Sequence, residues 1–426
     1  MKKIINNLIA SLTITVITAL PLVANDHIPT DSDTLCIKTH HPITDWGRGN
    51  QTFTTNFYSA LIPLNSNENF IFSPLSLQIN LSMVSEFAQG DTQLDLFHFA
   101  AVPHLASARQ RGAKNIITSF NSMIEDWDGP SKFIMANKVW FSKNTVSTPL
   151  TEGIVRDFYL SEVDFLDFQN NPESSRQEIN NWVDDRTLHQ IPELMSEGSI
   201  TTDSRVVLVN TFYMRSPWQM PFDPELTDEA PFYGLEKSLR TFPYMHQTGY
   251  FAFSESSNAQ IIDLPFQTLP ENSNRISLIV IVPKEGVSID DVELNLMSMT
   301  SADSLLTSMQ PTWVNLTLPR FKVSSSIDAK SVLQKMGLSL PFSEDAEFEF
   351  SGEGRLAVTD IIHQAVLEVN ERGGVASAGT GTSIGLTSMP EEAVDVVVNR
   401  PFLFFVVEKE KGLILFAGRI KQLRLE

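Results

Sequence analysis

The chain has 426 residues, 42% hydrophobic and 19% charged, an ordinary composition for a globular protein that can bury a large core. Its 31 Lys and Arg residues against 51 Asp and Glu residues give a net charge of −20, which disfavours nucleic-acid binding because phosphate backbones carry the same sign. The single cysteine, Cys36, excludes an intrachain disulfide, a four-cysteine zinc site and an iron–sulfur cluster. The densest basic run, Arg109, Arg111 and Lys114, is predicted to be a solvated face.

The amino terminus has the pattern of a secretory signal peptide. Lys2 and Lys3 precede a mostly apolar run from Leu8 to Ala24. An uncleaved anchor helix is the weaker alternative, because the run contains several hydroxyl residues and a proline and falls short of the ~20 apolar residues that span a bilayer. We therefore predict a signal peptide at 1–24 and a secreted or periplasmic protein that does not contact the membrane once the signal is removed.

The rest of the chain predicts one α+β domain. Residues 25–48 are polar and irregular, and no linker or repeat divides residues 49–426. Apolar residues at helical spacing predict helices over 76–87, with Ser76 as N-cap, and over 179–194. Short β-branched or alternating runs predict strands at 205–209, 276–282, 313–321, 402–407 and 413–417. Helices come mainly early and strands mainly late, which favours α+β over a repeating βαβ pattern.

Signals for enzyme chemistry are weak. None of the eight histidines lies in H-E-x-x-H or near C-x-x-C, and no phosphate-binding G-x-x-x-x-G-K-[ST] occurs, so we predict no metal and no cofactor. Residues 381–385 spell the G-x-S-x-G of hydrolases around Ser383, but that motif needs a strand before the serine and a helix after it. Neither is predicted here. A hydrolase is the least favoured interpretation.

The stretch from Gly373 to Ser383 is the most unusual part of the chain. Ten of its eleven residues are Gly, Ala, Ser or Thr, and no charge appears from Gly373 to Pro390. A flexible linker is the ordinary explanation for such a composition. However, the stretch lies between two predicted strands, 365–369 and 394–398, and its even positions from 374 to 382 are all small and uncharged. It is therefore a loop that could enter a sheet as a strand without desolvating a charge.

Short signatures spread over residues 49–426 resemble those of the serpin family. They are Asn69–Ser76 (N-x-x-x-S-P-x-S), Val209–Phe222 with its Asn and Trp, Met245–Gln247 (M-x-Q), Asn399–Phe405 and Leu413–Arg419. The resemblance implies three β-sheets, about nine helices and an exposed reactive loop near the C-terminus, at about 371–393. It also implies a monomer that is not an enzyme and that inhibits proteases by a suicide mechanism. A target protease would cleave the loop and form an acyl-enzyme, and the loop would then insert into the central sheet and trap the protease.

The resemblance also assigns candidate site residues. A polar gate beneath the central sheet, with an aromatic residue at the top where insertion starts, corresponds to Ser73, Ser76, Asn210, His363 and Trp218. By itself, His363 would be a satisfied core histidine and Trp218 a core tryptophan.

The hinge, where insertion begins, corresponds to Glu371, Gly373, Gly374, Val375, Ala376, Ser377 and Ala378. It departs from the family pattern at Gly374, where a Thr or Ser is usual, and at Val375, where a Glu is usual. The T-x-G-K-I element is also altered, to Thr187-Leu-His189-Gln-Ile191. The hinge has no charge or proline of the kind found in non-inhibitory members. Nevertheless, a non-inhibitory serpin that binds a ligand or serves as a decoy substrate is the alternative function.

The reactive bond is predicted by counting seventeen residues from Glu371, which puts Thr387 before the scissile bond and Ser388 after it. The second choice is the bond between Leu386 and Thr387, which would suit a chymotrypsin-like enzyme. No Arg or Lys occurs between Gly373 and Pro390, so a trypsin-like target is disfavoured. The predicted partner is an elastase-like or chymotrypsin-like serine protease, or a papain-like cysteine protease.

Overall fold

A computed structural model describes residues 45–121, 132–146, 148–187, 189, 191–235, 240–267, 275–298, 308–349, 351–352, 357–373 and 392–424. Eight α-helices lie in these residues: α1 (Trp46–Leu61), α2 (Pro74–Ser85), α3 (Gly90–Ala100), α4 (Ala106–Asn121), α5 (Pro149–Phe158), α6 (Pro172–Arg186), α7 (Ile289–Ser298) and α9 (Ala329–Lys335). Three short 3-10 helices, η1 (Ile62–Leu64), η3 (Pro224–Leu226) and η4 (Leu340–Phe342), accompany them. Among the described helices, none combines the length and apolar character that crossing a bilayer requires.

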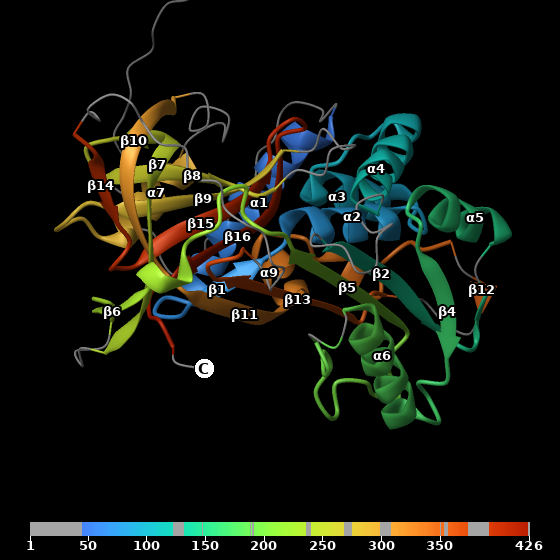
Figure 1. The fold of residues 1–426 in the computed structure, drawn as a ribbon. Coiled ribbons are helices and arrows are strands. Elements are labelled where there is room, and N and C mark those ends of the chain that lie inside the picture. The colour runs from blue at the N-terminus through green and yellow to red at the C-terminus, as the bar shows by residue number, and fades with distance from the viewer. Residues whose placement is uncertain are drawn as a thin grey trace, which may run out of the picture. The chain divides into compact units, whose positions relative to one another are not determined.

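The central five-stranded sheet has the order β11-β13-β5-β2-β4. Its strands are β2 (Lys132–Ser142), β4 (Glu162–Leu166), β5 (Val206–Arg215), β11 (Phe321–Asp328) and β13 (Asp360–Val369). β11 and β13 are antiparallel, and so are β2 and β5, but β13 and β5 run parallel in the middle of the sheet. Figure 1 shows β13 and β5 side by side, with α2 on one face of the sheet and α6 on the other.

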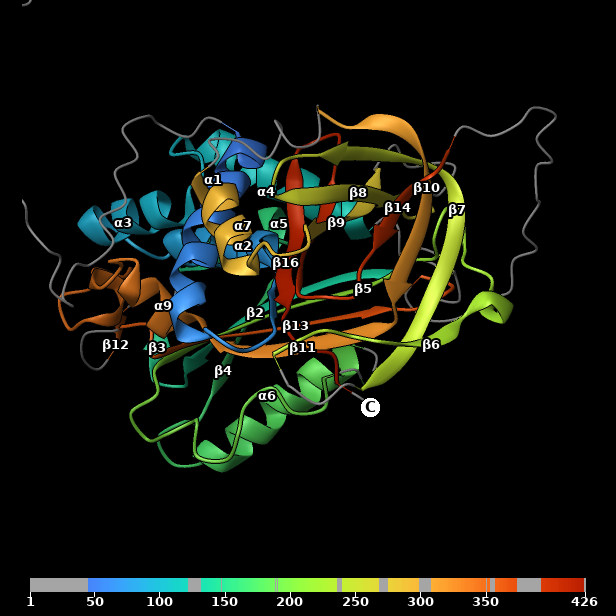
Figure 2. The ribbon, with the colours of Figure 1, turned by 90° about the vertical axis from the view of Figure 1, so that its left-hand side faces the viewer.

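A nine-stranded sheet carries most of the remaining strands, in the order β1-β16-β15-β9-β8-β7-β10-β14, with β6 paired to β7. They are β1 (Phe70–Phe72), β6 (Asp228–Pro231), β7 (Thr241–Glu255), β8 (Ala259–Pro265), β9 (Ile276–Pro283), β10 (Gln310–Pro319), β14 (Val394–Val397), β15 (Phe402–Glu408) and β16 (Leu413–Ile420). A small third sheet pairs β3 (Thr145–Val146) with β12 (Ser351–Gly352). Figure 2 shows β14 beside β10 at the edge of the large sheet.

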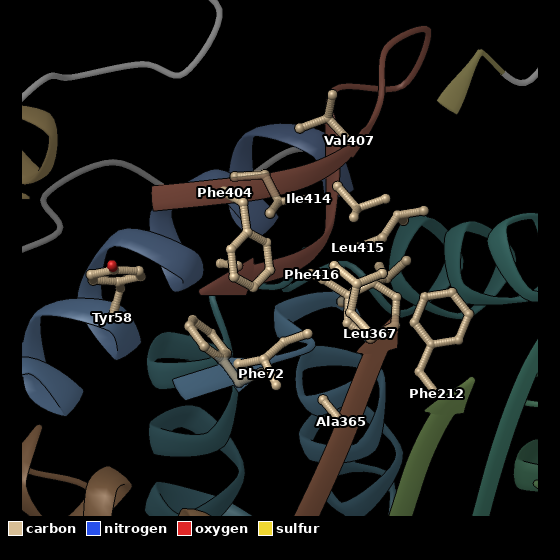
Figure 3. Packing of buried hydrophobic residues seen from close by; sticks show 14 of the residues in the cluster. Tyr58, Phe72, Phe212, Ala365, Leu367, Phe404, Val407, Ile414, Leu415 and Phe416 are labelled. Atoms are coloured by element: carbon tan, nitrogen blue, oxygen red, sulfur yellow. The ribbon is translucent and has the colours of Figure 1, made fainter. Parts of the chain in front are cut away.

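The main core fills the space between the two large sheets. Phe212 of β5 stacks on Phe416 of β16, with ring centroids 5.0 Å apart and planes 7° from parallel. Ala365 and Leu367 of β13 approach the same cluster, and Phe72 extends it toward α1 (Figure 3). Because side chains alternate across a strand, the odd-numbered residues of β13 lie on this inner face, and so do Val206, Leu208, Phe212 and Met214 of β5.

A second apolar cluster covers the outer face of the five-stranded sheet. Ile179 and Val183 of α6 and Ile200 from the segment after it are buried there together with Val209 of β5 and Val366 of β13. The cluster therefore lies over the β5–β13 pair, and α6 with its following segment shields that pair from solvent.

The first predicted helix is right in type but begins two residues earlier than expected. Pro74 occupies the first turn, where its missing N–H is no loss, and the cap is Ser73 rather than Ser76. The Ser73 hydroxyl accepts a hydrogen bond from the Ser76 N–H at 3.3 Å. The prediction for 179–194 was wrong at both ends, because α6 begins in polar sequence at Pro172 and ends at Arg186. Residues 191–200 instead pack as an irregular segment.

Two further predictions need correction. The strand predicted at 313–321 is two strands, because the chain leaves β10 at Pro319 and enters β11 of the other sheet at Phe321. The basic run of α4 is not a wholly solvated face. Arg109 is 3% exposed, its Nε lies 3.0 Å from Glu86 and its guanidinium lies over the Phe97 ring. The ion pair with Glu86 offsets part of the cost of burying the Arg109 charge.

Candidate functional site: the central strand pair and the hinge

The parallel β5–β13 pair is the structural centre of the candidate site. Its register runs from Asp360 opposite Val207 to Val366 opposite Tyr213. The chain leaves β13 at Val369 and, after residues 370–393, returns as β14 at the edge of the other sheet. A strand formed by the residues after β13 and folded back between β13 and β5 would be antiparallel to both. It would replace one parallel pair by two antiparallel pairs, and antiparallel pairing is slightly more stable per residue.

His363 links β13 to the start of α2 across the inner face of this pair. It is fully buried, and its Nε2 accepts a hydrogen bond from the Ser73 N–H at 2.8 Å. Burial lowers the pKa of His363 to about 3 from 6.5, so the imidazole is neutral at physiological pH. With Nε2 accepting, the neutral ring carries its proton on Nδ1.

The other gate residues lie around this bond. Ser73 and Ser76 are fully buried at the first turn of α2. The backbone register places Asn210 of β5 directly opposite His363 on one side and opposite Asn137 of β2 on the other. The side chain of Asn210 lies outside the described residues. The structure thus brings Ser73, Ser76 and His363 together and puts the Asn210 backbone in the adjacent strand position.

Trp218 lies at the upper end of the same pair, where β5 has just ended. It is 3% exposed and stacks on Phe266 with centroids 4.5 Å apart and planes 7° from parallel. Its indole Nε1–H donates to the Asn370 carbonyl at 2.8 Å, and its backbone N–H donates to the Arg372 carbonyl at 3.1 Å. Trp218 is therefore held against the segment that follows β13.

The first residues of the hinge form a tight turn at this point. Asn370 and Gly373 exchange backbone hydrogen bonds of 3.2 and 3.1 Å. Gly373 has φ +104°, and a Cβ there would lie 2.3 Å from the Ser216 carbonyl oxygen, so only glycine fits. The rest of the predicted hinge, Gly374, Val375, Ala376, Ser377 and Ala378, lies outside the described residues, as do Leu386, Thr387 and Ser388 of the predicted reactive bonds.

Glu371 anchors this turn through its side chain, which binds Arg320 and Thr227. Its side chain is 6% exposed, and its Oε1 accepts hydrogen bonds from Arg320 Nε and Thr227 Oγ1, each at 2.6 Å. Burial alone would raise the pKa of Glu371, but the bonds from Arg320 and Thr227 outweigh it and lower the pKa, so the carboxylate is ionised. The Glu371 carbonyl also accepts from the Phe222 N–H at 2.9 Å.

The sequence interpretation missed Arg320, Thr227 and Phe266, the partners that hold Glu371 and Trp218. Each is far from its partner along the chain, and none stands in a motif that marks such contacts. The one signal for Arg320 was its place between two alternating runs, Trp313–Leu318 and Phe321–Val323, where a chain reversal between sheets could have been expected.

These features define a class of protein: an α+β fold with a closed central sheet, in which the inner strand β13 is followed by a connection of 24 residues (370–393) to a strand of another sheet. A family model described as serpin (serine protease inhibitor) matches residues 48–423. The chain therefore belongs to the serpin family. Serpins generally act as protease inhibitors rather than as catalytic enzymes.

Individual relatives agree with this assignment. The chain is 30% identical to antithrombin-III of Mus musculus over 90% of this chain and 82% of the relative. It is 30% identical to intracellular coagulation inhibitor 2 of Tachypleus tridentatus, over 84% and 87% of the two chains. Among solved structures, Arabidopsis AtSerpin1 in its native stressed conformation matches with a TM-score of 0.78 at 25% identity, over 89% of this chain and 99% of that one. Human thyroxine-binding globulin has the same fold, with a TM-score of 0.77 at 24% identity over 89% and 98%.

Proposed function

We propose that this protein is an irreversible suicide inhibitor of serine endopeptidases, with papain-like cysteine endopeptidases as a second target class. The observation that carries the proposal is the closed parallel β5–β13 pair, continued by a small-residue loop without charge. Such a sheet can gain two antiparallel pairs when the cleaved loop enters between its middle strands. The resulting gain in free energy would drive the displacement of an acylated protease.

The loop is suited to this insertion on the face that must become buried. Its even positions from Gly374 to Thr382 are all small and uncharged. Because insertion buries one face of the new strand against the core, a charge on that face would be desolvated without a partner and would slow insertion. The protease would then hydrolyse the loop and leave.

The direct test mixes the purified protein with elastase, chymotrypsin, trypsin and a papain-like cathepsin, followed by denaturing gels and intact mass spectrometry. We expect a covalent complex with elastase, chymotrypsin or the cathepsin and none with trypsin. The released C-terminal peptide identifies the reactive bond, for which we propose Thr387–Ser388 ahead of Leu386–Thr387. Loop cleavage with no complex and no gain in thermal stability would contradict inhibition and favour a binding or decoy function.

A matched pair of variants tests the insertion step. Ala376→Glu puts a charge on the inserting face, whereas Val375→Glu puts the same charge one position away, on the opposite face. We expect Ala376→Glu to turn the inhibitor into a cleaved substrate and Val375→Glu to keep trapping. Unchanged trapping by Ala376→Glu, at the same ratio of inhibitor to protease, would refute insertion as the mechanism.

We also propose that residues 1–24 direct export and are removed. The support is the short basic start and the apolar run that ends at Ala24. Mass spectrometry of the protein recovered from cell fractions and medium would test this. A mature chain that begins near Asn25 is expected, and a protein that retains Met1–Ala24 in the cytosol would contradict the proposal.

A further inference from the structure

A cavity of about 540 Å³ lies beside the hinge and outside the β5–β13 pair. Its walls come from the start of β7, the start of β11, the end of β13, residues 370–372 and the C-terminal segment at Arg424. The volume is within the ~300–1,000 Å³ range of small-molecule sites.

The charge of this cavity is opposite to that of the protein. Four cationic residues line it, against two acidic ones, whereas the whole chain carries 31 cationic and 51 acidic residues. The four cations are Arg320, Lys322, Arg372 and Arg424, and the two acids are Glu368 and Glu371.

Both acidic residues of the cavity already interact with neighbouring polar or cationic residues. Glu371 accepts from Arg320 and Thr227. Glu368 lies directly opposite Lys322 in the β11–β13 register and accepts a hydrogen bond from the Asn370 side chain at 3.2 Å. Neither acid is paired with Arg372 or Arg424.

Arg372 and Arg424 are therefore the two cations of the cavity whose charge is not matched by one of its acidic residues. Both are exposed, and within the described ranges neither guanidinium has a hydrogen-bond or ion-pair partner. A guanidinium presents a planar fork of N–H donors that matches carboxylate and phosphate oxygens. Two such groups on one cavity, in a protein that is otherwise strongly acidic, favour a ligand with several negative oxygens.

We propose that this cavity binds a small multivalent oxyanion, a polycarboxylate or a polyphosphate, with the guanidinium groups of Arg372 and Arg424 as its principal ligands. The site is formed by the closed state of the hinge, because Arg372 is held there through the bond from the Trp218 N–H to its carbonyl.

A consequence for inhibition rests on the proposed function. If the loop enters between β5 and β13, the contacts that join residues 217–218 to residues 372–373 must break, since the new strand passes between them. An anion that binds Arg372 in its present position stabilises the closed state by RT ln(1 + [L]/Kd), where [L] is the free anion concentration. We therefore expect the bound anion to slow insertion and to increase the fraction of inhibitor that is cleaved without trapping.

The binding test uses the full chain and isothermal titration calorimetry at one fixed ionic strength, because exposed charges are screened by salt. The probes are propane-1,2,3-tricarboxylate and pyrophosphate, with acetate as a monovalent comparison. We expect saturable binding of one trivalent or tetravalent anion per chain, with acetate at least tenfold weaker. The tighter of the two probes identifies the ligand class. Absence of saturable binding by both probes would overturn the proposal.

Two variants and one control locate the site. Arg372→Gln and Arg424→Gln should each weaken binding at least fivefold, while Arg156→Gln, at an exposed arginine on α5 outside the cavity, should leave it unchanged. On the unaltered protein, the anion should protect Arg372 and Arg424 from phenylglyoxal, as peptide masses would show. Equal affinity of the variants, or no protection, would refute this site. Binding is measured without a protease, so a failure to trap proteases leaves this result independent of the proposed function.

Discussion

The buried His363 predicts a loss of stability in mild acid, which can be calculated. The folded protein keeps the imidazole neutral down to a pKa of about 3, whereas the unfolded chain takes up a proton near pH 6.5. Between these values unfolding binds a proton, so the free energy of unfolding falls as the pH falls. From pH 7.5 to pH 5, protonation of His363 in the unfolded chain lowers the free energy of unfolding by about 2 kcal/mol. The figure follows because pH 5 lies about 1.5 units below the unfolded pKa and each unit corresponds to ~1.36 kcal/mol.

His363→Gln is the matched perturbation for this prediction. An amide oxygen can still accept from the Ser73 N–H, but the amide does not titrate in this range. Other groups that titrate between pH 5 and 7.5 contribute to both proteins and cancel in the difference. We expect the natural protein to be the more stable at pH 7.5 and its advantage to shrink by about 2 kcal/mol at pH 5.

Two assays measure this difference. Urea unfolding followed by tryptophan fluorescence gives the free energies. Native gels after mild heating give the rate at which monomer is lost to polymers or to an inserted form, and 2 kcal/mol corresponds to a change of up to about 30-fold in that rate. Parallel pH profiles for His363→Gln and the natural protein would refute the argument that a neutral His363 holds the central sheet closed.

Two further predictions concern the hinge. Gly373→Ala combines the strain of a positive φ with a clash between the new Cβ and the Ser216 carbonyl. At Gly198 φ is +79° but the space around a Cβ is open, so Gly198→Ala should cost only the backbone strain of about 1 kcal/mol. Thermal unfolding should show Gly373→Ala to be at least 1 kcal/mol the worse, and equal costs would mean that the turn adapts. Glu371→Gln removes the charge that Arg320 and Thr227 bind, and it should cost about 1–3 kcal/mol and speed polymer formation on native gels. An unchanged rate would show that this ion pair does not hold the hinge.

The parts of the fold that the sequence predicted well are those whose signal is local. The run at 276–282 is buried on both faces and forms β9, and the pair at 402–407 and 413–417 forms β15 and β16 around Gly412 at φ +63°. Where local signal was absent or misleading, prediction failed. The first turns of α6 are polar and show no periodicity, and the only local mark of the passage between sheets is a shift of the apolar alternation by one position at Arg320.

In the candidate site, too, residues with a local sequence signal were predicted and their distant partners were not. Ser73, Ser76, His363 and Trp218 were found because they stand in short signatures, and the hinge was found by its composition. Their partners were not, because a bond such as that between Arg320 and Glu371 joins residues 51 positions apart and leaves no mark on either segment. Nor could the sequence reveal that His363 is fully buried, the condition that sets its pKa.

The contacts at the two ends of the β5–β13 pair suggest how closure and release are balanced. At the level of α2, a neutral hydrogen bond from the Ser73 N–H to His363 connects β13 to the inner helix. At the level of the hinge, Trp218, Glu371 and the Gly373 turn hold the start of the loop outside the sheet. A neutral hydrogen bond contributes only about 0.5–1.5 kcal/mol net, and a hydrogen bond to a charged group such as Glu371 about 1.5–3 kcal/mol, so each contact can break when an inserted strand forms its own ladder. Opening should therefore begin at the hinge, where the incoming strand gains hydrogen bonds as the hinge contacts are lost, and reach His363 only later.

Variants of Glu371 should consequently change the rate of insertion after cleavage more than variants of His363 do. A larger effect from variants of His363 would mean that the sheet opens first at the level of α2 and not at the hinge.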